Sequence, residues 1–188
     1  MIRVKAELAK LVNKFDFINC IETGTIRTYT EKHESTRHIS ELIGEKGNLK
    51  SVDIEQKSLD ISKDICNNAA NVEWILSDSI EYLKKDNDKY HFVLLDSVND
   101  ANHILEEFKL VAKRIHAGGV LMIDDAGVAL DKIPLENNGI YAPKKAVEVN
   151  KFLQDIGVDY EIVVGGHPGN QLLLKATPDN IQKIESSL

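Results

Sequence analysis

Residues 18–25, Ile-Asn-Cys-Ile-Glu-Thr-Gly-Thr, decide the fold of this chain. An apolar segment of strand length runs into Glu22 and then into a turn that holds a single glycine, Gly24, and a helical pattern begins about ten residues later. The next apolar segment, Leu49-Lys-Ser-Val-Asp53, also ends on a carboxylate. A strand, a glycine-containing turn, a helix and a strand that ends on an acidic residue are the parts with which a doubly wound sheet holds a nucleoside cofactor.

The composition describes an ordinary globular domain. The 188 residues, 43% hydrophobic and 28% charged, suit one domain (1–188) with a sizeable core. A net charge of −7 disfavours attraction to phosphate backbones, so nucleic acid is not expected as the main partner. No apolar run approaches the ~20 residues that span a bilayer, so no membrane association is expected. Cys20 and Cys66 lack metal-ligand spacing, which favours a reduced, cytoplasmic setting.

Apolar segments of strand length alternate with amphipathic segments of helix length. Two of them, Phe92-Val-Leu-Leu-Asp96 and Val120-Leu-Met-Ile-Asp124, are almost continuously apolar, as is typical of strands with helices on both faces. The alternation predicts an α/β fold, a doubly wound and mostly parallel sheet with right-handed crossovers. Strands are expected at 17–22, 49–53, 72–76, 90–95, 118–124, 159–164 and 170–176, and helices near 3–14, 34–46, 56–69, 78–86, 100–116, 143–156 and 178–187.

The C-terminal part departs from this rhythm. Tyr160–Val164 and Gln171–Lys175 are strand-like, and the glycines and proline of Gly165–Asn170 between them favour a tight reversal. Five parallel strands are therefore expected to be followed by a sixth and by an antiparallel seventh.

Each of the five expected parallel strands delivers a carboxylate at or just after its carboxyl end, where open α/β sheets bind ligands. These residues are Glu22, Asp53, Asp78, Asp96 and the pair Asp124-Asp125. Helix capping explains Asp78 well and Asp53 in part, because Asp is a preferred N-cap. It explains Asp96 and the pair less well.

The order of Glu22-Thr-Gly-Thr25, Ser-Val-Asp53, Asp78-Ser79, Leu-Leu-Asp96 and Gly-Gly-Val-Leu-Met-Ile-Asp124-Asp resembles class I S-adenosylmethionine-dependent methyltransferases. Within that group it is most similar to small-molecule O-methyltransferases of the catechol/caffeoyl-CoA and cephalosporin-hydroxylase-like kind, from about residue 15 to the C-terminus. The resemblance implies a Rossmann-like, seven-stranded sheet with an antiparallel last strand, in agreement with the hairpin. It also implies an enzyme that transfers a methyl group to a small-molecule acceptor through a hydroxyl oxygen, and it leaves a homodimer open.

The resemblance assigns roles to individual residues. Glu22 to Thr25 would lie against the amino-acid part of the cofactor, and Gly24 would permit this approach because a Cβ would collide with the ligand. Asp53 would accept hydrogen bonds from the ribose hydroxyls, and Asp78 and Ser79 would lie beside the adenine. The implied cofactor-binding residues are Glu22, Thr23, Gly24, Thr25, Ser35, Asp53, Ile54, Asp78, Ser79 and Asp96.

A metal ion and a base are the catalytic elements that we expect. Asp96 would lie below the reacting methyl group and, with Asp124 and Asp125, would offer the oxygen ligands that suit Mg²⁺ or Ca²⁺. Such an ion would orient an acceptor hydroxyl and lower its pKa. The alternative is that these aspartates cap helices, position the cofactor or bond to nearby backbone.

Histidine offers a second route to catalysis. His167 in the terminal turn is expected at the ligand end of the sheet, where it would act as a base, with a solvent-exposed turn histidine as the alternative. His91, His103 and His116 are expected to be structural. Lys144 and Lys145 are interpreted as the start of the next helix.

Three segments are expected to set the substrate. Ile26–His33 is inserted before the helix, so Asp53 lies 29 residues after Gly24, against roughly 20 in dinucleotide folds. We expect a lid or part of the substrate pocket there, with a plain surface loop as the alternative. The segment 126–142 is unusually long for a connection and is a second candidate flap, and the N-terminal helix (1–14) is the third segment.

The shortage of glycine indicates which cofactor is bound. A pyrophosphate needs close backbone approach and a helix N-terminus near the first strand, whereas S-adenosylmethionine has no phosphate. A carboxylate at Glu22 would also repel a phosphate. S-adenosylmethionine is therefore preferred to NAD or FAD. The alternatives are a non-catalytic domain that binds S-adenosylmethionine or another nucleoside, and an NAD-using α/β enzyme.

Overall fold

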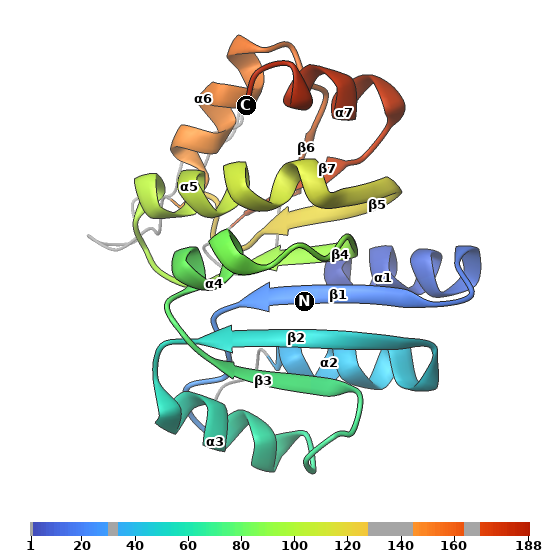
Figure 1. Ribbon diagram of the computed structural model, residues 1–188, viewed down its shortest axis with the longest axis vertical. Coiled ribbons are helices and arrows are strands. Elements are labelled where there is room, and N and C mark those ends of the chain that lie inside the picture. Colours follow the sequence, from blue (N-terminus) through green and yellow to red (C-terminus); the bar gives the residue numbers. More distant parts are fainter. Residues whose placement is uncertain (1, 30–33, 128–144, 164–169) are drawn as a thin grey trace.

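The computed structural model describes residues 2–29, 34–127, 145–163 and 170–188, and within them one mixed sheet forms the centre of the molecule (Figure 1). Its strands are β1 (Ile18–Thr23), β2 (Gly47–Asp53), β3 (Val72–Leu76), β4 (Tyr90–Leu95), β5 (Ile115–Ile123), β6 (Glu161–Val163) and β7 (Gln171–Lys175). The helices are α1 (Ile2–Lys14), α2 (Ser35–Ile43), α3 (Gln56–Ile65), α4 (Ser79–Lys85), α5 (Ala101–Val111), α6 (Val147–Asp155) and α7 (Pro178–Glu185), with short 3₁₀ turns at Gly44–Lys46 and Ala112–Arg114.

The strand order is β3-β2-β1-β4-β5-β7-β6. The first five strands pair in parallel, and β7 lies antiparallel between β5 and β6. The fold class and the antiparallel last strand are thus confirmed. Since Thr23 pairs with Leu95 and Leu95 with Ile123, the neighbouring strands β1, β4 and β5 end at one level of one edge.

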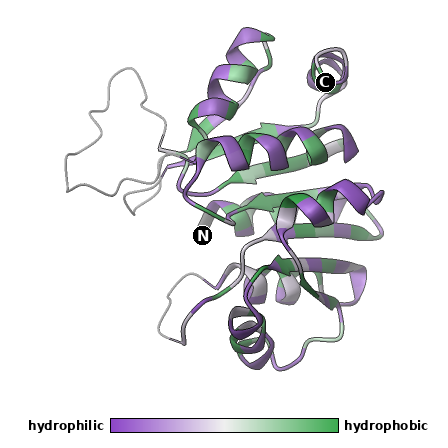
Figure 2. Ribbon diagram, turned by 60° about the vertical axis from the view of Figure 1, so that its left-hand side comes forward, coloured by the Kyte–Doolittle hydropathy of each residue, from purple (hydrophilic) through white to green (hydrophobic). Residues whose placement is uncertain are grey.

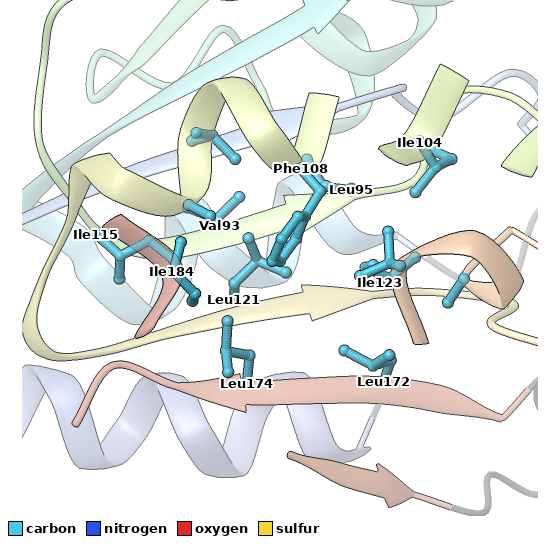
Figure 3. Close-up of a cluster of buried hydrophobic side chains, with 14 of the residues drawn as sticks. Val93, Leu95, Ile104, Phe108, Ile115, Leu121, Ile123, Leu172, Leu174 and Ile184 are labelled. Carbon is cyan, nitrogen blue, oxygen red and sulfur yellow. The ribbon is translucent and has the colours of Figure 1, made fainter. Parts of the chain in front are cut away.

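Helices cover both faces of the sheet and create two hydrophobic cores. One core holds side chains of α1 and α2, such as Leu8 and Ile39, and the other holds side chains of α4, α5, α6 and α7. In Figure 3 the Phe108 ring of α5 points toward Leu121 of β5, among side chains of β4, β5 and β7. Hydrophobic residues gather along the strands, and hydrophilic ones colour the outer sides of the helices (Figure 2).

The period-2 alternation of the strands explains why both cores form. In β4, Phe92 and Leu94 belong to the core under α1 and α2, while Val93 and Leu95 belong to the opposite core. These side chains are almost completely buried, and each such burial contributes about 1.5–3 kcal/mol. A near-continuous apolar strand is the sequence signature of this two-sided burial.

The start of β5 differs from the expectation. The strand begins at Ile115, which pairs with Tyr90, although residues up to 116 were expected to be helical. The register shifts between Tyr90 and Phe92, and the glycine pair Gly118-Gly119 interrupts the apolar pattern that would have marked the strand. Among the described residues, no helix is long and apolar enough to cross a membrane.

Candidate functional site

A cavity of about 480 Å³ lies over the carboxyl ends of β1, β2, β3 and β4. This volume falls within the roughly 300–1,000 Å³ that small-molecule sites occupy. It is lined by Gly24, Arg27, Val52, Asp53, Ile54, Glu55, Ser77, Asp78, Ser79, Ser97, Val98, Asn99 and His103. Acidic side chains outnumber basic ones along this lining, so the cavity favours a cationic ligand over an anionic one.

Gly24 joins the first strand to the cavity, and the packing of the chain itself requires a glycine at this position. Its φ of +85° lies in the left-handed region, and a Cβ there would come within 2.4 Å of the Asp96 carbonyl oxygen. A side chain at this position would therefore collide with the backbone after β4. The glycine lets the turns after β1 and β4 pack against each other.

Asp53 organises the wall of the cavity after β2. Its Oδ2 accepts from the backbone N–H of Thr25 at 2.9 Å and from the Thr25 hydroxyl at 3.0 Å, and its Oδ1 accepts from the Glu55 N–H at 2.8 Å. A carboxylate has about four acceptor positions, so these three bonds leave about one for a ligand. The first role of Asp53 is to hold the turn that follows β1.

The region after β3 contains a helix cap and a series of polar side-chain contacts. Asp78 caps α4 by accepting from the Glu81 N–H at 3.0 Å, which confirms the capping interpretation. Ser79 Oγ lies 3.0 Å from His103 Nε2, and the same nitrogen lies 3.5 Å from Oε1 of the fully buried Glu107. Because Ser79 and Glu107 meet one ring nitrogen, they do not form the two-sided Ser-His-acid relay of a hydrolase.

His103, which was expected to be structural, is part of the cavity wall. The Glu107 carboxylate, 3.5 Å from Nε2, raises the pKa of the imidazole above its ordinary value, against the lowering effect of burial. The nearby charges of Asp78 and Asp100 act in the same direction as Glu107. The wall thus offers a ligand a polar group that gains a proton readily.

Glu22 lies below the cavity at the end of β1 and is fully buried. Its Oε1 accepts from the Ser51 hydroxyl at 2.7 Å, and its Oε2 has no hydrogen-bond partner among the described residues. Burial raises its pKa to about 7, although the hydroxyls of Thr36, Ser51 and Ser35 lower it. Ser35 and Thr36 belong to the first turn of α2, so the Glu22 carboxyl group lies near the start of this helix.

Asp96 and Asp124 follow the neighbouring strands β4 and β5, and each has a partner from a distant segment. Asp96 Oδ1 accepts a hydrogen bond from the ammonium of Lys145, whose side chain is almost fully buried. Asp124 Oδ1 accepts from the Gln171 amide at 2.8 Å. Burial raises the pKa of Asp96 to about 6, Lys145 lowers it, and Asp124 and Asp125 raise it further.

The metal site expected on Asp96, Asp124 and Asp125 does not fit this geometry. Within the described part of the chain, no group of three His, Cys, Asp or Glu side chains could hold a metal ion. The physical reason is that the Lys145 ammonium and the Gln171 amide each bond to one carboxylate oxygen of the set, and the ammonium would also repel a divalent ion.

The predicted cofactor residues form two layers. Gly24, Asp53, Ile54, Asp78 and Ser79 line the cavity. Glu22, Thr23, Thr25 and Ser35 are buried outside the lining, and Asp96 is partly exposed at its border, directly before the lining residue Ser97.

The segments expected to form lids are only partly described. Of the insertion 26–33, Ile26 is buried, and its N–H donates to the Ser62 hydroxyl at 3.0 Å. Arg27 lines the cavity, and its guanidinium donates to the Ser97 carbonyl at 2.7 Å. Residues 30–33, most of 126–142 and His167 lie outside the described residues.

Sequence reasoning missed Arg27, His103 and Lys145. The first two had a usable signal, because residues just after a strand and in the first turn of the next helix face the ligand edge. Lys145 had none, because its partner Asp96 is 49 residues away.

No protein-family model matches the sequence, and neither does any curated protein. Solved structures do match. A putative caffeoyl-CoA O-methyltransferase from Staphylococcus aureus superimposes with a TM-score of 0.66, at 13% identity over 93% of this chain and 83% of that one. The O-methyltransferase TomG from Streptomyces achromogenes, in complex with SAM, gives 0.62 at 17% identity over 93% and 79%. The N-methyltransferase NodS from Bradyrhizobium japonicum gives 0.59 at 12% identity over 93% and 95%.

This likeness shows the fold. The chain has the Rossmann-like methyltransferase fold, in agreement with the resemblance found in the sequence. The solved structures include both O- and N-methyltransferases, so the fold does not define the acceptor atom.

Proposed function

We propose that the chain binds S-adenosylmethionine in the cavity and transfers its methyl group to the hydroxyl oxygen of a small-molecule acceptor. One observation carries the proposal: an acidic cavity of small-molecule size over the carboxyl ends of β1–β4, with the buried carboxyl group of Glu22 near the end of β1.

This arrangement supports a cofactor without phosphates. In dinucleotide folds the pyrophosphate lies at the N-terminus of the helix after the first strand. In this chain Glu22 lies at the first turn of α2, and Glu34 stands at the N-cap. Glu34 is paired with Arg37 at 2.8 Å, so the repulsion of a pyrophosphate rests on Glu22 in its ionised form, which argues against NAD and FAD.

The lining fits a nucleoside. Ile54 and Val98 offer exposed apolar side chains on the cavity wall, and Asp53 keeps about one acceptor position for a sugar hydroxyl. Ser79 and His103 provide polar atoms for a base edge. The acidic lining suits the positive charge of a sulfonium ligand.

S-adenosylmethionine supplies an electrophilic methyl group, which moves from sulfur to the acceptor oxygen while the acceptor loses its proton. The chain contributes mainly by positioning, since in-line attack depends on the alignment of the reacting atoms. Asp96, about a third exposed beside the cavity, is placed to take the acceptor proton. The net charge of −7 supports a small acceptor over a nucleic acid, because an acidic surface disfavours attraction to phosphate backbones.

Calorimetric titration tests the binding half of the proposal. S-adenosylmethionine and S-adenosylhomocysteine are expected to bind with micromolar affinity, and NAD is not. Asp53→Asn should weaken binding about 30-fold, because it removes the charge and one acceptor of the turn. Glu55→Gln is the matched control on the same wall, with an expected change below about threefold. Absence of S-adenosylmethionine binding at millimolar concentration would refute the proposal.

A methyl-release assay over phenols, hydroxy acids and amines tests the catalytic half. Turnover of hydroxyl acceptors is the expected result. Binding without turnover of any acceptor would point to the non-catalytic alternative, and turnover of amines alone would move the acceptor atom from oxygen to nitrogen.

A further inference from the structure

Three carboxyl groups stand at the ends of the neighbouring strands β1, β4 and β5. Side chains two positions apart along a strand lie on the same face. Glu22, Asp96 and Asp124 each follow by two positions a residue of the core under α1 and α2, namely Cys20, Leu94 and Met122. The three carboxyl groups therefore lie on this same face of the sheet. The Asp96 N–H donates to the Thr23 carbonyl at 2.9 Å and the Asp124 N–H to the Leu95 carbonyl at 3.2 Å. The hydrogen-bond ladders therefore continue past the strand ends and keep the carboxyl groups in one row.

Lys145 places an ammonium group at the middle of this row. Its side chain is 4% exposed and bonds to Asp96. Its backbone is also fixed, because the N–H groups of Lys145 and Ala146 donate to the carbonyls of Asp125 and Ala126 at 3.4 and 3.0 Å. The residues that precede α6 are thus tied directly to the segment that carries Asp124 and Asp125.

A divalent ion at the same place would meet this ammonium at close range. Two like charges a few ångström apart repel by several kcal/mol in a partly buried site. It would also compete with the Gln171 amide for Asp124 Oδ1. Lys145 already balances the charge of Asp96, the middle carboxyl group of the row, which an ion would otherwise do.

We propose that the Lys145 ammonium takes the place of a divalent cation between β4 and β5, as a positioning residue that holds Asp96 ionised and oriented. The methyl transfer proposed above then needs no metal. The inference deepens that function, but cation binding tests it separately from cofactor binding.

The first test is titration of the chelator-treated protein with Mg²⁺ and with Ca²⁺ by calorimetry. No saturable site is expected below about 1 mM. A one-to-one site in the micromolar range that is lost in Asp96→Asn would overturn the proposal.

The second test removes the internal cation. Lys145→Met leaves the row of carboxyl groups without its ammonium, so this variant should gain a Ca²⁺ or Mg²⁺ site at least roughly tenfold tighter than any in the wild type. The same gain should appear as a rise in Tm when the cation is added. Lys145→Arg keeps the charge and should gain nothing.

Lys175→Met is the matched control, since it removes a lysine from the exposed pair with Glu161 and should gain no cation affinity. Lys145→Gln serves as a second variant if Lys145→Met does not fold. No gain in either neutral variant would overturn the inference.

Activity gives the third readout. Turnover by the wild type should be unchanged by a chelator, whereas Lys145→Met should lose kcat more than KM and regain part of it with Ca²⁺ or Mg²⁺. Chelator inhibition of the wild type would overturn the proposal. Failure of S-adenosylmethionine to bind would instead refute the proposed function and leave the cation titrations valid.

Discussion

Asp53 and Asp96 stand at the carboxyl ends of parallel strands at the same edge of the sheet, yet their carboxylates have different hydrogen-bond partners. Asp53 is held by neutral donors, two from Thr25 and one from Glu55, so its negative charge stays available to the cavity. Asp96 is held by the Lys145 ammonium, so its charge is balanced within the chain. The carboxylate of Asp53 is thus left to attract a cationic ligand, whereas the carboxylate of Asp96 already has a cation from the chain.

Gly24 lies between these two residues, and its replacement should have the largest effect. Gly24→Ala puts a Cβ within 2.4 Å of the Asp96 carbonyl oxygen at a φ of +85°. Left-handed strain and the backbone collision should together cost about 3–5 kcal/mol of the free energy of unfolding. Chemical denaturation measures the loss.

Gly44→Ala is the control for strain without collision. Gly44 has a φ of +49°, and a Cβ there would meet no described atom within 4 Å beyond its own local backbone. It should cost only about 1 kcal/mol. Equal costs for the two variants would show that the packing of the two turns contributes little.

Glu22 extends the comparison to a buried carboxyl group that lacks a cation. Because folding raises its pKa from 4.5 to about 7, the folded state binds more protons than the unfolded state between these values. The contribution of Glu22 to stability should therefore be fully present below about pH 4.5 and be lost as the pH rises through about 7, by on the order of 3 kcal/mol.

Glu22→Gln should remove this pH dependence. The difference in free energy of unfolding, variant minus wild type, should be more favourable to the variant at pH 8 than at pH 5. Urea denaturation at both pH values measures it. Glu45→Gln, at an exposed position, is the control and should leave the profile unchanged. An unaltered profile in Glu22→Gln would contradict the assignment.

The fold was predictable from the sequence because its signals are local. Near-continuous apolar runs such as Val120–Ile123 indicate strands buried on both faces, and Gly165–Asn170 indicated the reversal before β7. The start of β5 was not predictable, because its pairing with Tyr90 depends on a neighbouring strand rather than on the glycine-rich sequence itself.

The candidate site was predictable only where its partners belong to the strand-end motifs. Asp53 and Asp78 were identified from their position after apolar segments. Lys145 was not, because only the folded chain brings it to Asp96. His167 lies outside the described residues, so its role as a base stays a prediction.

The coupling energy of the Asp96–Lys145 ion pair should be smaller than the stability changes expected for Gly24→Ala and Glu22→Gln. A double-mutant cycle of Asp96→Asn and Lys145→Met should give about 2 kcal/mol, because each single variant leaves a partly buried charge without its partner. The exposed pair Glu161–Lys175 should couple by less than about 0.5 kcal/mol. Equal couplings would mean that burial adds nothing to the Asp96 pair.

The smallest effect should come from the neutral donors of Asp53. Thr25→Val removes one hydroxyl donor but keeps the backbone N–H bond, so it should cost about 1 kcal/mol of stability. Affinity for S-adenosylmethionine should change by less than about threefold, because the freed acceptor position of Asp53 becomes available to a ligand hydroxyl. Ser58→Ala, which removes a hydroxyl bonded to Glu55 at 3.3 Å, is the control for loss of a buried hydroxyl near the cavity. If Thr25→Val weakens binding as strongly as Asp53→Asn, Asp53 acts by shaping the turn. If only Asp53→Asn weakens it, Asp53 acts by its charge, as the contrast with Asp96 requires.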